Sequence, residues 1–152
     1  MPYIKKSKKG EYKVSKNIDE ERMKRHQQYL DKHLPAIECL FNIFQDKINN
    51  SDHVAIIDTR HKDKRALERA VSQKDIMTVL KNGDIIETSK IDESTYDVLI
   101  MSYVKNTTNY RPLHISAIFD ADRDMLKIKT VYDPRSKEEQ WTNSYTTRVF
   151  FK

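Results

Sequence analysis

The spacing of hydrophobic residues changes about halfway along the chain. In the first half, apolar residues recur every three or four positions, which is typical of the buried face of an α-helix. Between residues 113 and 132, apolar and polar residues mostly alternate, which is typical of β-strands with one buried face. Residues 96–104 also predict a strand, which is apolar on both faces. The sequence therefore predicts an α+β fold, with N-terminal helices packed on one face of a four- to five-stranded antiparallel sheet.

Four helices are predicted in the first half, and they cover residues 18–33, 35–48, 60–71 and 72–80. The second begins at Pro35, because proline is accepted in the first turn of a helix. The fourth begins at Ser72, which with Asp75 resembles a capping box. Gly83 is predicted to end it in a left-handed conformation. Residues 54–57 form a short apolar run that is either a strand or the entry to the third helix.

The second half predicts a meander of strands over residues 85–87, 96–104, 113–120 and 125–132. The last two form a hairpin whose loop spans residues 121–124, with Asp120 opposite Met125. The final residues, 141–152, are either another strand or an extension held by a partner.

The hairpin pairing sorts its side chains onto two faces, because residues directly opposite each other share a face. The core face is predicted to hold Leu113, Ile115, Ala117, Phe119, Leu126, Ile128, Thr130 and Tyr132. The open face is predicted to hold His114, Ser116, Lys127 and Lys129. A lysine-bearing face around a histidine suits a phosphodiester backbone, although lysines are also common on strands that simply face solvent.

Charge is concentrated at the N-terminus of this 152-residue chain. Residues 1–16 contain six lysines and one glutamate, which equals the formal net charge of +5 for the whole chain. The remaining residues therefore have a formal net charge of zero. The N-terminal lysines either contact phosphate or only solvate the terminus. We predict three parts: a basic flexible arm (1–17), a helical extension (18–50) and an α+β domain (51–152).

Cysteine usage and hydropathy indicate the compartment. Cys39 is the single cysteine, so no internal disulfide forms, and the sequence lacks both a signal peptide and a long apolar run. These features favour the cytoplasm and predict no contact with a membrane. Cys39 falls within an apolar helix stripe, which predicts a core position. The histidines and acids have no recognised ligand spacing, so neither a metal nor another cofactor is expected.

Four segments carry a family resemblance, namely residues 65–69, 75–87, 111–114 and 130–132. Together they resemble the bacterial family called domain of unknown function 4258, which is similar to the BrnT and RelE toxins, small ribonucleases of toxin–antitoxin pairs. One position departs from the family pattern. Arg65 replaces a histidine that tends to precede the sequence Ala-Leu-Glu-Arg, and His61 stands one helical turn earlier.

The resemblance implies a metal-independent endoribonuclease toxin whose partners are RNA, free or ribosome-associated, and a protein antitoxin. His114 is the predicted general acid or base, because its pKa lies near neutral, and Lys129 is predicted to stabilise developing charge. Arg69 and Arg111 are predicted to clamp the phosphate. The predicted RNA contacts are Arg65, His61, Lys127 and Tyr132.

Two alternatives remain open at this stage. The departure at Arg65 favours a module on the same fold that binds RNA or protein without catalysis. A phage or mobile-element inhibitor that acts through residues 18–50 is the other alternative.

Overall fold

The structure is a computed structural model that describes residues 2–6, 12–50, 52–60, 71–106 and 108–152. Its helices are α1 (Glu20–Asn49), α3 (Gln73–Asn82) and the 3-10 helix η1 (Pro134–Gln140). Its strands are β1 (Pro2–Lys6), β2 (Tyr12–Asn17), β3 (Ala55–Asp58), β4 (Asp84–Lys90), β5 (Thr95–Asn106), β6 (Asn109–Asp120), β7 (Met125–Tyr132), β8 (Trp141–Thr142) and β9 (Thr147–Arg148).

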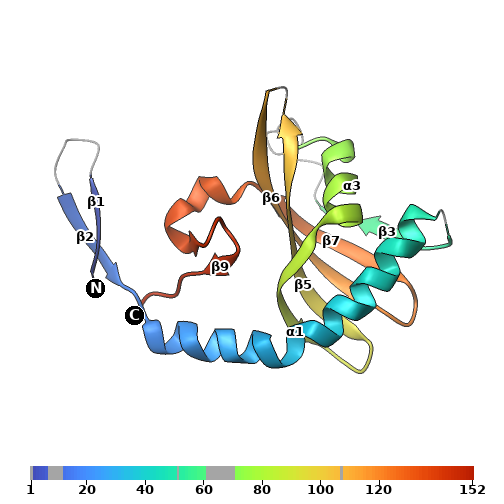
Figure 1. Ribbon diagram of the computed structural model, residues 1–152, viewed down its shortest axis with the longest axis horizontal. Helices are drawn as coiled ribbons and strands as arrows, with labels where there is room; N and C mark the ends of the chain where they lie inside the picture. The colour runs from blue at the N-terminus through green and yellow to red at the C-terminus, as the bar shows by residue number, and fades with distance from the viewer. Residues whose placement is uncertain (1, 7–11, 51, 61–70, 107) are drawn as a thin grey trace.

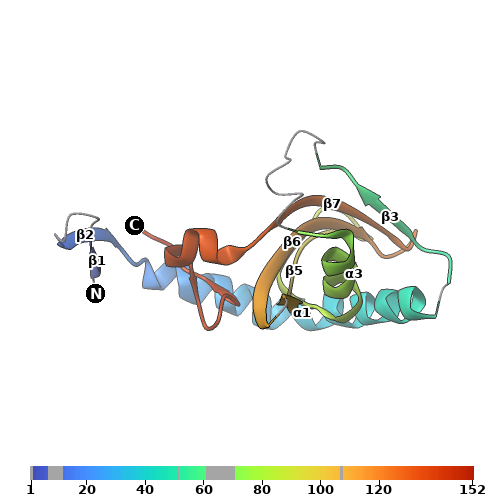
Figure 2. The same cartoon turned by 90° about the horizontal axis from the view of Figure 1, so that it is seen from above.

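The main sheet has five strands in the order β3-β7-β6-β5-β4. Strands β4 to β7 form the predicted antiparallel meander, and β3 adds to the edge in parallel with β7. The sheet curves around α3 and the second half of α1 (Figure 2). This arrangement confirms the predicted α+β fold class.

Of the two alternatives predicted for residues 54–57, a strand or the entry to a helix, the structure shows the strand, which is β3. On this edge strand Ile56 packs partly buried against the core, whereas Ile57 is 41% exposed.

Helix α1 is continuous where the sequence predicted two helices. It begins after Asp19, whose carboxylate accepts a hydrogen bond from the Arg22 backbone N–H (3.0 Å). Pro35 lies inside the helix rather than at the start of a second one. A proline inside a helix removes one backbone hydrogen bond and commonly bends the helix, and α1 changes direction part-way along its length in Figure 1.

The second half of α1 is part of the main core. Phe41 and Phe44 are 2% and 1% exposed, and both rings pack edge-to-face against Phe119 of β6. Gln45 is also buried, and its amide donates to the carbonyl oxygens of Leu80 and Gly83, where α3 ends. The core therefore spans the predicted boundary at residue 50. Cys39, in contrast, is exposed, so its predicted core position was wrong.

Helix α3 confirms its predicted start and corrects its predicted end. The Ser72 hydroxyl accepts from the Asp75 backbone N–H (3.1 Å). Gly83 has a φ of −76° and is extended, so it does not adopt the left-handed conformation. Glycine is needed there for space: a Cβ atom would lie 2.5 Å from the Val79 carbonyl oxygen and 2.9 Å from that of Met101.

The C-terminal end of the chain lies beside the start of α1 (Figure 1). Strands β1 and β2 pair as an antiparallel hairpin where the sequence predicted a basic arm. Residues 141–152 were predicted as another strand or as an extension held by a partner, and they contain two short strands that lie outside the main sheet. Strands β8 and β9 pair with each other, and Phe151 bridges Ile18. Neither α1 nor α3 is long and apolar enough to cross a membrane.

Candidate functional site

The face of the sheet away from α3 carries aligned rows of polar side chains. Leu99 pairs with Glu87 on one side and with Ser116 on the other, and Ser116 pairs with Thr130. Strand pairing thus aligns one residue from each of β4, β5, β6 and β7 on this face. We call it the open face.

Two β-bulges flank this row. On β4, both Ile86 and Glu87 lie opposite Leu99. On β7, Lys129 is the extra residue, because Ser116 pairs with Thr130 while Ala117 pairs with Ile128. Bulges redirect side chains and are common beside active sites.

The bulge on β7 corrects part of the predicted hairpin register. The pairs Asp120–Met125 and Ile118–Lys127 are confirmed, and Leu113, Ile115, Ala117 and Phe119 form the core face as predicted. Beyond the bulge, His114 faces Tyr132 rather than Val131. Thr130 and Tyr132 therefore lie on the open face, and Val131 takes the core position that they were predicted to fill.

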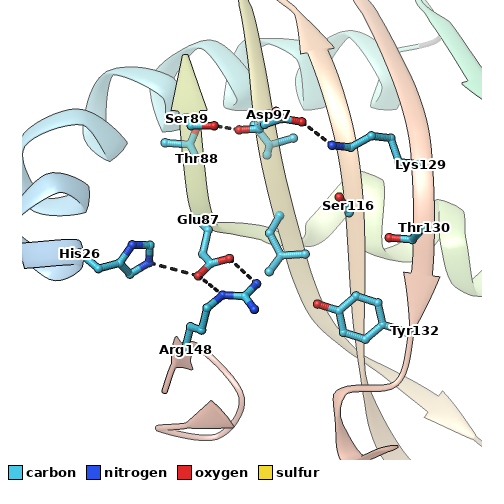
Figure 3. Close-up of a pocket in the computed structure, with 12 residues that line it drawn as sticks. His26, Glu87, Thr88, Ser89, Asp97, Ser116, Lys129, Thr130, Tyr132 and Arg148 are labelled. Carbon is cyan, nitrogen blue, oxygen red and sulfur yellow. Dashed lines mark hydrogen bonds and ion pairs between the residues drawn. The ribbon is translucent and has the colours of Figure 1, made fainter. Parts of the chain in front are cut away.

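A charged cluster occupies one end of the row. The Arg148 guanidinium donates from Nε and Nη2 to the two Glu87 carboxylate oxygens at 2.9 and 2.8 Å, and His26 Nε2 lies 3.1 Å from Oε2 (Figure 3). These residues come from α1, β4 and β9. A forked pair of this kind is stronger than a single neutral hydrogen bond, and it raises the pKa of Arg148.

The cluster borders a polar cavity of about 370 Å³ on the open face. Lys129 closes the other side by its ion pair with Asp97. The cavity lining also includes Ser116, Thr130 and Tyr132, which supply hydroxyl groups. The site thus combines a histidine that contacts a carboxylate with two cations, which are groups suited to acid–base work on a phosphate ester. Among the described residues, no group of three or more His, Cys, Asp or Glu side chains could hold a metal ion.

His114, the predicted general acid or base, is 0% exposed. The C-terminal segment covers the open face at this point, and the Trp141 ring packs edge-on against the imidazole. A carbonyl oxygen only accepts, so His114 Nε2–H donates to Tyr145 (2.8 Å) and Nδ1 accepts from the Tyr132 hydroxyl (3.1 Å). Burial lowers the pKa of His114 from 6.5 to about 4, which keeps the ring neutral near pH 7.

Tyr132 lies on the open face but is held in the same buried network. Burial raises the pKa of its hydroxyl to about 12, so Tyr132 stays protonated and donates to His114. Tyr132 lines the main cavity as a neutral hydroxyl.

The structure separates the other predicted site residues. Lys129 lines the main cavity, whereas Lys127 lines a different cavity with Asp92 and Asp120. Arg111 is mostly buried, with its Nε 3.7 Å from an oxygen of Asp133, and does not border the main cavity. The open face therefore does not bring Lys127 or Arg111 to His114 as predicted. His61, Arg65 and Arg69 lie outside the described residues.

Comparison with known proteins identifies one family. Residues 59–133, just under half of the chain, match the family described as "Domain of unknown function (DUF4258)". This segment is therefore similar to the DUF4258 family. No curated protein and no solved structure is significantly similar to the chain.

The DUF4258 match includes Glu87 and Lys129 but excludes two members of the charged cluster, His26 and Arg148. Sequence reasoning missed both, because each comes from a segment outside the resemblance. Arg148 does lie in residues 145–151, which were left open as a strand. The sequence carried no signal that links His26 to Glu87.

Proposed function

We propose that this protein is a metal-independent endoribonuclease, of the toxin type that the resemblance implied, and that it cleaves RNA at the cavity on the open face. The observation that supports the proposal is the Glu87 carboxylate, held by Arg148 and in contact with His26 at the edge of a polar cavity. RNA and a protein antitoxin are the proposed partners.

The chemistry uses the 2′-hydroxyl of the RNA as its nucleophile. His26 accepts the proton from this hydroxyl as the 2′-oxygen attacks the phosphorus atom, and Glu87 orients the imidazole. Arg148 and Lys129 offset the negative charge that develops on the phosphate. The bond from phosphorus to the 5′-oxygen breaks, this oxygen takes a proton from solvent, and the products carry a 2′,3′-cyclic phosphate and a 5′-hydroxyl.

A non-catalytic binding module is the second candidate, and one observation favours it. Arg148 and Lys129 are each paired with a carboxylate of the same chain, Glu87 and Asp97. A phosphate must therefore compete with these carboxylates for its cations. This candidate predicts that the cavity binds RNA or a protein and leaves RNA intact.

The test is cleavage of a single-stranded RNA in the presence of EDTA. Wild type should release products with 2′,3′-cyclic phosphate ends, and His26→Ala should lower the rate by about 100-fold or more, the usual scale for loss of an acid or base. His33→Ala is the matched control, because His33 is exposed on the same helix and borders neither the charged cluster nor the cavity. RNA that stays intact with wild type, purified free of any antitoxin, would refute the proposal.

A further inference from the structure

A second cavity lies on the other side of the charged cluster. It measures about 200 Å³ and lies between the first half of α1, β4 and the C-terminal segment. His26, Glu87 and Arg148 line both this cavity and the main one. The proposed catalytic groups thus stand between two cavities rather than at the end of one.

The two cavities differ in chemistry. The main cavity presents hydroxyl groups and the Lys129–Asp97 pair, which suit a ribose and phosphate. The second cavity is lined by aliphatic side chains, with neutral polar groups near them. Its aliphatic residues are Leu30, Leu34, Ile85 and Ile86, and its neutral polar residues are Gln27, Thr146 and Thr147.

The size and lining of the second cavity indicate its ligand. Pockets for drug-sized molecules measure roughly 300–1,000 Å³, so a cavity of about 200 Å³ fits a smaller group. An aliphatic lining favours a flat, weakly polar group whose apolar surface leaves water. A nucleobase has these properties, and its edge can bond the Gln27 amide or the threonine hydroxyls.

We propose that the two cavities hold the two nucleotides that flank the scissile phosphate, with the base of one nucleotide in the second cavity. This inference rests on the proposed function and specifies its substrate as a dinucleotide unit of single-stranded RNA. An enzyme that cuts within a chain must hold nucleotides on both sides of the bond, and the shared lining of the two cavities supplies both places.

The test is binding of a dinucleotide whose first sugar is 2′-deoxyribose, which cannot supply the attacking hydroxyl. Its affinity is compared with that of a nucleoside 3′-monophosphate. Burying roughly 40 Å² of the apolar surface of a base is worth a factor of about 5 in affinity. Wild type should therefore bind the dinucleotide at least about 5-fold more tightly than the mononucleotide.

Two tryptophan variants distinguish binding in the second cavity from a general effect of a large side chain on the helix surface. Gln27→Trp fills the entrance of the second cavity from an exposed helix position and should abolish the preference for the dinucleotide. Gln28→Trp makes the same change at the next exposed position, which borders neither cavity, and should keep it. Gln28→Trp should also keep the wild-type affinity for the mononucleotide.

The remaining outcomes show whether the proposed function or only the further inference fails. If wild type binds neither ligand, the proposed function fails and the inference fails with it. If wild type binds both ligands equally, or if Gln27→Trp keeps the preference, the inference alone is overturned.

Discussion

His114→Ala should destabilise the protein strongly, although the hairpin pattern predicted that His114 lies on the open face rather than in the core. The change removes the hydrogen-bond partner of the Tyr145 carbonyl oxygen and one partner of the Tyr132 hydroxyl, which also bonds to Arg148. Each buried group left without a partner costs about 1–3 kcal/mol, and the space beside Trp141 adds to the loss. We expect a total of about 3–5 kcal/mol, or roughly 6–20 °C in Tm for a chain of this size.

The same residue should make stability depend on pH. Folding lowers the pKa of His114 from 6.5 to about 4, so between these values the unfolded chain binds a proton that the folded chain does not. Stability from this residue is therefore complete above about pH 6.5 and is lost as the pH falls toward 4. The loss in wild type is about 3 kcal/mol, and His114→Ala should lack this component.

Both effects can be measured by thermal unfolding and by urea unfolding, each followed by circular dichroism at pH 7 and at pH 4.5. A His114→Ala protein whose Tm lies within about 2 °C of wild type would refute the buried position of His114. A pH dependence that is equal in wild type and variant would refute its lowered pKa.

Two further predictions concern Gly83 and Cys39, for which the structure corrected the prediction made from the sequence. Gly83→Ala should destabilise the fold by at least about 1–3 kcal/mol, because its Cβ would meet the backbone of Val79 and Met101; an unchanged urea midpoint would contradict this packing. Cys39 should react fully with a thiol reagent in the native protein, because its side chain is exposed; a thiol that reacts only after denaturation would restore the predicted core position.

The sequence predicted the meander and its core face well, because alternation reports which side chains of a strand are buried. It could not predict the bulge at Lys129, because nothing in the local pattern distinguishes an extra residue from a regular one. A shift of one residue moves every later side chain to the opposite face. Tyr132 was therefore assigned to the core, whereas it lies on the open face.

The charged cluster was harder to predict, because its members lie far apart in the sequence. His26, Glu87 and Arg148 meet only through the packing of α1 and the C-terminal segment beside β4. His114 illustrates the same difficulty. Alternation placed it correctly on the face away from the core, but the segment that covers this face follows about 30 residues later and showed no clear strand or helix pattern.

The most direct test of the central claim is the single-turnover cleavage rate of one RNA, with EDTA present, for wild type and Glu87→Gln. The glutamine keeps the shape of the side chain but removes the charge that contacts His26 and Arg148. The account predicts a rate at least about 100-fold lower for the variant, with circular dichroism showing that it remains folded. Equal rates for the two folded proteins would contradict a catalytic site at this cluster.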